Sequence, residues 1–146
     1  MDRKTFLQQL GVACLCSTSL AVWLEGCAGI HYAQHEWQEK DKQIILKKTE
    51  FRSEKEGKDR KFVIVRNEKL PFPIYVWKHE TEFIALYMCC THKGCELNAQ
   101  NEFLICPCHG AEFDRFGKVQ NPPADKDLLR FEVKEDTENV YVLLAF

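Results

Sequence analysis

Residues 90–95, Cys-Thr-His-Lys-Gly-Cys, and residues 106–110, Cys-Pro-Cys-His-Gly, decide the fold of this chain. Each stretch supplies a cysteine sulfur and a histidine nitrogen within a few residues, together with one further cysteine. Two thiolates and two imidazoles form a ligand set that fits an iron–sulfur cluster. The same ligand types would also serve a tetrahedral zinc ion, which is the alternative reading of the pattern.

Both stretches resemble the cluster loops of the Rieske iron–sulfur proteins of cytochrome bc-type complexes. In that family the loops read close to Cys-Thr-His-Leu-Gly-Cys and Cys-Pro-Cys-His-Gly-Ser. The resemblance continues downstream, where residues 113–119 and Pro122-Pro123 look like the family's strand, turn and proline-rich loop. It covers roughly residues 60–146.

The resemblance assigns a role to each cysteine and histidine of the two loops. It implies a [2Fe-2S] cluster with one iron held through cysteine sulfur and the other through histidine nitrogen. It also implies a disulfide between Cys95 and Cys108, one from each loop, which joins the loops around the cluster. A zinc site would leave these two cysteines without a role. The predicted cluster ligands are Cys90, His92, Cys106 and His109.

Short runs rich in β-branched and aromatic residues recur along the chain, separated by turn residues. This pattern predicts an all-β domain. The resemblance implies a Rieske-type antiparallel β-sandwich with a cluster-binding subdomain formed by two loops. A hairpin turn is expected at residues 78–82 and a solvated loop at 53–60. Strands are predicted at residues 43–48, 62–66, 74–78, 83–88, 103–106, 128–134 and 140–144.

The N-terminal sequence predicts export and membrane attachment. The apolar run at residues 10–24 is shorter than the roughly 20 residues that cross a bilayer as a helix, so residues 1–26 read as a signal peptide. Arg3-Lys4 resembles a twin-arginine export signal with lysine as its second residue. Leu24-Glu25-Gly26-Cys27 resembles a lipobox, which makes Cys27 the predicted lipidation site. The alternatives are an uncleaved membrane anchor and ordinary cleavage near Ala28.

The domain organisation follows from these segments. Residues 1–26 are expected to be a signal peptide or membrane anchor, 27–42 a tether, and 43–146 the cluster domain. The tether is predicted because its sequence shows neither strand alternation nor a sustained helical stripe. His31 and His35 are interpreted as surface or packing residues, not as a metal pair. Cys89 is expected to be a buried free thiol at the end of a strand.

Composition and charge exclude several function classes. The formal net charge is −2 and no basic patch is present, which argues against nucleic-acid binding. No phosphate-binding loop, catalytic triad or repeat appears. The leader and the predicted disulfide place the protein in the bacterial cell envelope, with the cluster domain facing the periplasm or the exterior.

The resemblance implies a membrane-tethered carrier of single electrons. In the family, a ligand histidine accepts a hydrogen bond and a proton from a quinol, and the domain then moves to a cytochrome c-type acceptor. The expected partners are therefore a quinol-oxidising respiratory complex and that acceptor. The alternative is the small electron-transfer subunit of a periplasmic molybdenum oxidase resembling arsenite oxidase. A cytoplasmic Rieske ferredoxin is disfavoured, because those proteins lack the Cys95 and Cys108 pair and a leader.

Three residues depart from the family pattern. Ala111 and Phe113 stand where the family often has serine and tyrosine, whose hydroxyls donate hydrogen bonds to cluster and cysteine sulfurs. Their absence predicts a lower midpoint potential and a low-potential donor such as menaquinol. Lys93 replaces an apolar leucine at the cluster tip, and a lysine is unsuited to an apolar docking surface.

Overall fold

The structure, a computed structural model, describes residues 29–53 and 57–145. The predicted signal peptide or anchor at 1–26 and the predicted lipidation site at Cys27 lie outside the described residues, as does part of the predicted loop at 53–60. Over the described ranges the chain forms strands and one short 3-10 helix, η2 (Lys48–Phe51). No helix in these ranges has the length and hydrophobicity needed to span a membrane.

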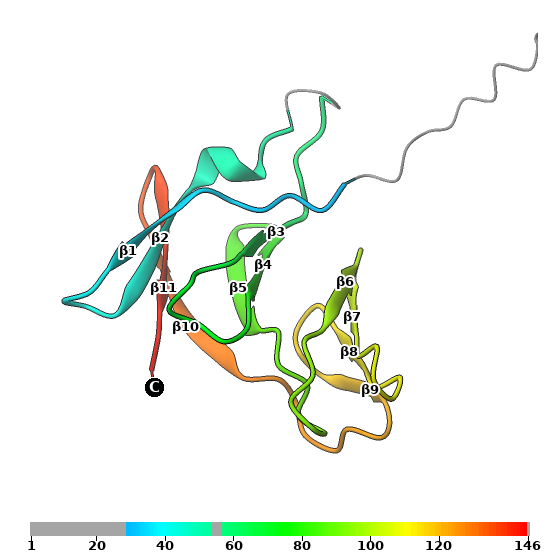
Figure 1. The fold of residues 1–146 in the computed structure, drawn as a ribbon. Helices are drawn as coiled ribbons and strands as arrows, with labels where there is room; N and C mark the ends of the chain where they lie inside the picture. The colour runs from blue at the N-terminus through cyan, green and yellow to red at the C-terminus, as the bar shows by residue number, and fades with distance from the viewer. Residues whose placement is uncertain (1–28, 54–56, 146) are drawn as a thin grey trace, which may run out of the picture.

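Seven strands form the larger of two antiparallel sheets (Figure 1). Along the sheet the order is β1-β2-β11-β10-β5-β4-β3, so strands from both ends of the chain meet in its middle. The strands are β1 (His35–Gln38), β2 (Gln43–Lys47), β3 (Phe62–Val65), β4 (Ile74–His79), β5 (Glu82–Tyr87), β10 (Arg130–Glu135) and β11 (Asn139–Leu143).

This sheet folds over itself through β10. The first residues of β10 pair with β5, with Phe131 opposite Ala85, and the later ones pair with β11, with Glu132 opposite Leu143. The strand therefore passes from one layer of the sandwich to the other. Alternate residues of the two layers point inward, as the two-residue period of a strand requires, and form one buried cluster. Its members include Ile44, Leu46, Val63, Val76, Val140 and Val142.

A smaller sheet carries the cluster loops and lies beside the sandwich, at the lower right of Figure 1. It contains β6 (Asn98–Gln100), β7 (Phe103–Ile105), β8 (Glu112–Asp114) and β9 (Val119–Asn121). A second apolar cluster joins it to β4 and β5. Leu104 and Phe113 of the small sheet and Tyr75 of the sandwich are fully buried there. The base of the cluster loops is therefore fixed to the sandwich by packing.

The predicted all-β fold is confirmed. Each of the seven predicted strands is present, with ends within two residues of the prediction, and the β4–β5 hairpin turns at the predicted residues. Trp77 of β4 is buried. Strands β1, β6 and β9 were not predicted, and β8 was implied only by the family resemblance at residues 113–119. Each of these has only three or four residues, too few for an alternating pattern to stand out.

The prediction of a tether at residues 27–42 is wrong for the part that the structure describes. Strand β1 pairs with β2 along its whole length, and the residues before it lie against β3, where the Ala33 amide donates to the Ile64 carbonyl. His31 Nε2 lies 2.7 Å from the Glu50 carboxylate, and the His35 ring contacts the Asn67 side chain. Both histidines therefore hold the N-terminal segment to the domain.

Gly117 closes the turn between β8 and β9, and we expect Gly117→Ala to destabilise the protein. Its φ of 84° is one that residues with a Cβ rarely adopt. A Cβ there would lie 2.9 Å from Leu86 Cδ2 and 3.3 Å from Leu128 Cβ. Strain and overpacking together should lower the free energy of unfolding by about 2–4 kcal/mol, measured by denaturant unfolding.

Gly57→Ala is the matched control for this prediction. Gly57 also has a positive φ, 61°, but a Cβ there meets no atom within 4 Å. Gly57→Ala should therefore lower the free energy of unfolding only through backbone strain, by about 1 kcal/mol. Equal losses of stability in the two variants would show that the contact with Leu86 and Leu128 has no effect.

Candidate metal centre

The two cluster loops have the same backbone hydrogen-bond pattern, and each begins at a cysteine. In the first loop the Cys90 amide donates to the Cys95 carbonyl at 2.8 Å, and the Gly94 amide donates back to Cys90. In the second, the Cys106 amide donates to the Ala111 carbonyl and the Gly110 amide donates back to Cys106. Gly94 and Gly110 both have positive φ, 69° and 77°. A cysteine followed by a glycine four residues later is therefore the sequence pattern that indicates this loop.

This backbone pattern places the first cysteine of each loop in the interior. Cys90 and Cys106 are 2% and 1% exposed, and both are free thiols hydrogen-bonded to each other. Burial raises the pKa of the Cys90 thiol, while the amides of His92 and Lys93, which hydrogen-bond its sulfur, act in the opposite direction. Amides directed at a sulfur stabilise it as a thiolate, which is the form that binds metal.

The two loop histidines lie together. The rings of His92 and His109 have their centroids 4.9 Å apart and are nearly perpendicular, at 86°. His92 is half-buried and His109 is exposed. Nδ1 of His92 is buried without a hydrogen-bond partner among the described residues. A buried nitrogen without a partner is costly, and coordination to a metal would remove that cost.

The disulfide between Cys95 and Cys108 is present in the structure, as the sequence resemblance implied. It joins the two loops. The sulfurs of Cys95, Cys106 and Cys108 all lie within 4.8 Å of one another, so the bridge lies directly beside a predicted ligand. Cys95 and Cys108 use their sulfurs in the bridge and do not form a further metal site. The four predicted ligands are thus brought together by one pair of loops, and their donor set fits a [2Fe-2S] cluster.

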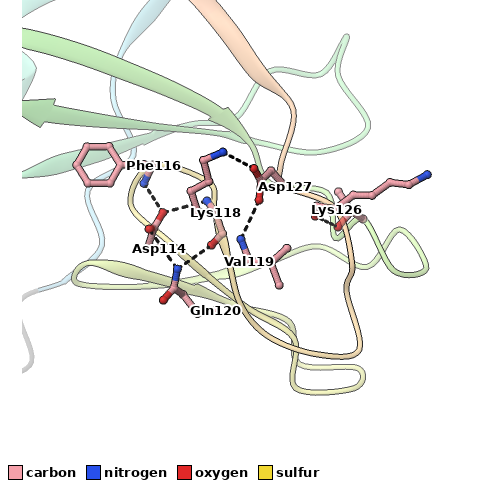
Figure 2. Close-up of polar contacts among 8 residues, drawn as sticks. Asp114, Phe116, Lys118, Val119, Gln120, Lys126 and Asp127 are labelled. Carbon is pink, nitrogen blue, oxygen red and sulfur yellow. Dashed lines mark hydrogen bonds and ion pairs between the residues drawn. The ribbon is translucent and has the colours of Figure 1, made fainter.

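A third segment, residues 121–127, is held close to these loops through the turn between β8 and β9 (Figure 2). Asp114 Oδ1 accepts hydrogen bonds from the Phe116 and Lys118 amides at 2.8 and 2.9 Å and so closes the turn. Asp127 accepts from the Val119 amide and pairs with the Lys118 ammonium at 2.6 Å. These contacts lower the pKa of Asp127, with the hydrogen bond from Lys118 as the largest cause.

Thr91 connects the first cluster loop to this third segment, and sequence reasoning did not identify its role. Its hydroxyl donates to the Lys126 carbonyl at 2.6 Å. The contact spans 35 positions of the sequence, so no local pattern could have predicted it. Asp114, by contrast, has a recognisable signal, because an aspartate that accepts from the amide two residues later is a common turn former.

Cys89, Ala111 and Phe113 lie beside the proposed ligands and are not ligands themselves. Cys89 is a free cysteine, half-buried beside the ligand loop, with its backbone bridged to Glu96. Burial is the main reason why its pKa is raised. Ala111 and Phe113 are completely buried below the second loop. The positions at which the family often has hydroxyl groups therefore carry a methyl group and a phenyl ring in the interior.

Comparison with known families agrees with this geometry. The family model described as "Rieske [2Fe-2S] domain" matches residues 41–134, well over half of the chain. That range contains both cluster loops and the third segment.

The curated relatives that the chain resembles include iron-sulfur subunits of the cytochrome b6-f complex. The chain is 42% identical over 55 residues to the cytochrome b6-f complex iron-sulfur subunit of Synechococcus sp. (strain RCC307), covering 36% of this chain and 31% of the relative. It is 38% identical over 78 residues to the cytochrome b6-f complex iron-sulfur subunit 1 of Nostoc sp. (strain PCC 7120), covering 50% and 42%. The chain thus spans less than half the length of these relatives.

A solved structure shares the fold. The crystal structure of the cyanobacterial plasma membrane Rieske protein PetC3 from Synechocystis PCC 6803 superposes with a TM-score of 0.50. The sequence identity is 32%, and the match covers 57% of this chain and 87% of that one.

Proposed function

This chain belongs to the Rieske [2Fe-2S] domain family and binds a [2Fe-2S] cluster, and on this premise we propose that it carries single electrons from a quinol to a cytochrome c-type acceptor. The observation that carries the proposal is the pair of equivalent loops with two buried free cysteines and two adjacent histidine rings. The kinship with cytochrome b6-f iron-sulfur subunits supports a quinol-linked role.

In this proposal Cys90 and Cys106 hold one iron, and His92 and His109 hold the other. Nδ1 is the coordinating atom of His92, because it is buried and has no other partner. The bound cluster supplies one-electron redox chemistry. The ring nitrogen of each histidine that is not bound to iron can accept a hydrogen bond and a proton from a quinol hydroxyl. His109 is exposed, so a quinol can reach it from the solvent side.

The buried Ala111 and Phe113 favour a low-potential donor such as menaquinol. We expect Ala111→Ser and Phe113→Tyr each to raise the midpoint potential, and the double variant to raise it further. The reason is that a hydroxyl donor near a sulfur stabilises the reduced, more negative state more than the oxidised state. Redox titration followed by electron paramagnetic resonance measures the shift. Unchanged potentials, with hydroxyls seen by crystallography to contact sulfur, would show that burial sets the potential instead.

We further propose that the protein is exported and held at the membrane through its N-terminal segment, by acylation at Cys27 or by an uncleaved anchor. The cluster domain then faces the periplasm or the cell exterior, where its disulfide persists. Because residues 31–38 are bound to the domain, any free connection to an anchor must lie before His31.

Purification from native membranes tests this function. We expect a cytochrome b and a cytochrome c to copurify with the protein, and the complex to oxidise a menaquinol analogue. Mass spectrometry of the same sample should show a mature N-terminus at Cys27 with acyl chains, whereas an N-terminus at Met1 or Asp2 would support the uncleaved anchor. Copurification of a molybdenum subunit without a cytochrome b would contradict the quinol role and support the arsenite-oxidase-like alternative.

A further inference from the structure

The first described residues present an apolar surface at the point where the chain enters the domain. Ile30 and Tyr32 are 45% and 53% exposed, and they are two of the four large apolar side chains that are exposed in the described ranges. The other two, Phe103 and Leu129, lie on separate elements. Single exposed apolar side chains are common on proteins, but Ile30 and Tyr32 occupy alternate positions of one segment and so form a surface together.

Backbone pairing fixes the direction in which these two side chains point. Tyr32 pairs in parallel with Ile64 of β3, because the Ile64 amide donates to the His31 carbonyl at 3.0 Å and the Ala33 amide donates to the Ile64 carbonyl at 2.9 Å. Side chains alternate along a segment paired in this way. Ala33 points into the buried cluster of the sandwich. Ile30 and Tyr32, one and three positions away from Ala33, therefore point outward at the margin of the sheet.

The segment that carries this surface is held firmly to the domain. The Glu50 carboxylate accepts the Gln34 amide at 3.2 Å and lies 2.7 Å from His31 Nε2. Strand β1 then pairs with β2 along its whole length, and the Lys69 ammonium lies over the Trp37 ring, 5.1 Å from its centroid. The apolar surface therefore keeps a constant orientation relative to the rest of the domain.

Little chain separates this surface from the proposed membrane attachment. An extended chain spans at most about 3.6 Å per residue. His31 is the fourth residue after Cys27, so an acylated Cys27 lies within about 14 Å of the paired segment. If the apolar run that ends at Leu24 is an uncleaved anchor, the limit is seven residues, about 25 Å. With either anchor, this side of the domain stays close to the bilayer.

From the exposure, direction and reach of these residues we infer that Ile30 and Tyr32 form a contact surface for the lipid bilayer, which holds the domain in one orientation on the membrane. The inference rests on the proposed membrane attachment. A tyrosine ring with its hydroxyl suits the interface of a bilayer, and an isoleucine suits its acyl boundary. Two side chains alone bind a membrane weakly, but an anchor raises their effective concentration there, so they need only orient the domain.

This orientation leaves the ligand loops uncovered. The described chain begins in the upper half of Figure 1, whereas the cluster loops lie at the lower right. It also limits rotation of the domain, because the segment that would serve as a free tether is paired with β2 and β3.

Fluorescence quenching by brominated lipid tests the contact. The full chain, purified from native membranes with its cluster, is reconstituted into phosphatidylcholine vesicles with and without bromine on the acyl chains. We expect the emission that Tyr32→Trp adds to that of the unchanged protein to be lost in the brominated vesicles. These vesicles carry no net charge, so the quenching reports apolar contact and not attraction to anionic lipid.

Leu129→Trp is the matched control for this measurement. Leu129 is also large, apolar and exposed, at 46%, but it follows the third segment beside the cluster loops. The emission that Leu129→Trp adds should therefore be the same in both kinds of vesicle.

The orientation of the cluster gives a second readout. In stacked, oriented membranes, the electron paramagnetic resonance signal of the reduced cluster should change with the angle between the magnetic field and the membrane plane. The variant Ile30→Glu/Tyr32→Glu should lose this angular dependence, because ionised carboxylates avoid the apolar part of the bilayer. Its iron content should stay the same, since both side chains are exposed and distant from the ligands. Leu129→Glu should retain the angular dependence.

The outcomes separate this inference from the proposed function. Absence of quenching in Tyr32→Trp, equal quenching in Leu129→Trp, or full angular dependence in Ile30→Glu/Tyr32→Glu would overturn the bilayer contact. Absence of quenching with an angular dependence found only in native membranes would assign the surface to a protein partner instead. In all these cases the protein still floats with the vesicles and its cluster is still reduced. A protein that does not float with the vesicles would contradict the proposed membrane attachment itself.

Discussion

Cys106→Ala is expected to reduce the iron and acid-labile sulfide content of the purified protein to background. Cys106 is buried, its thiol is hydrogen-bonded to that of Cys90, and it supplies one of the two sulfur ligands of one iron in the proposed arrangement. A buried site cannot replace this sulfur with water without disrupting the loops. The signal of low average g value in electron paramagnetic resonance, which marks a reduced Rieske centre, should be lost together with the iron.

Cys89→Ala controls for the loss of a cysteine next to the site. Cys89 precedes the other proposed sulfur ligand, Cys90, is also a free thiol, and has no ligand role in the proposed arrangement. This variant should keep two irons and two sulfides per chain and an unchanged resonance signal. Retention of the full cluster in Cys106→Ala, combined with its loss in Cys89→Ala, would show that the ligands are assigned to the wrong cysteines.

The double substitution Cys95→Ala/Cys108→Ala is expected to have the second largest effect. The bridge closes a loop with a sequence separation of 13, and removing such a cross-link typically costs about 3 kcal/mol of unfolding free energy. Because the bridge also holds the two ligand loops together, the cluster should be lost faster. Changing both cysteines avoids leaving a reactive thiol beside Cys106.

Two measurements check the effect of the bridge. Denaturant unfolding followed by circular dichroism gives the loss of stability, and the decay of visible absorbance gives the rate of cluster loss. Cys89→Ala again serves as the control, with stability and cluster lifetime close to those of the unchanged protein. A double variant whose cluster decays at the original rate would mean that packing of the small sheet alone holds the loops in place.

The local sequence was sufficient to predict six of the seven strands of the larger sheet, and it located the two loops that supply the proposed ligands. A strand of five or six residues carries a recognisable alternation, as in β2, where Ile44 and Leu46 point inward. The ligand loops are also local, because each is closed by hydrogen bonds within six residues and by one glycine of positive φ. The pairing of Cys95 with Cys108 came from resemblance to a known family, since spacing alone does not determine connectivity.

Contacts distant in sequence were decided only by the tertiary structure. Strand β1 becomes a strand because β2 offers it a hydrogen-bonding edge, which is why residues 35–38 were wrongly assigned to a tether. Thr91 reaches Lys126 only after the loops and the third segment have folded together. Short-range sequence patterns record local backbone preferences, whereas strand pairing and side-chain packing depend on distances that the completed fold sets.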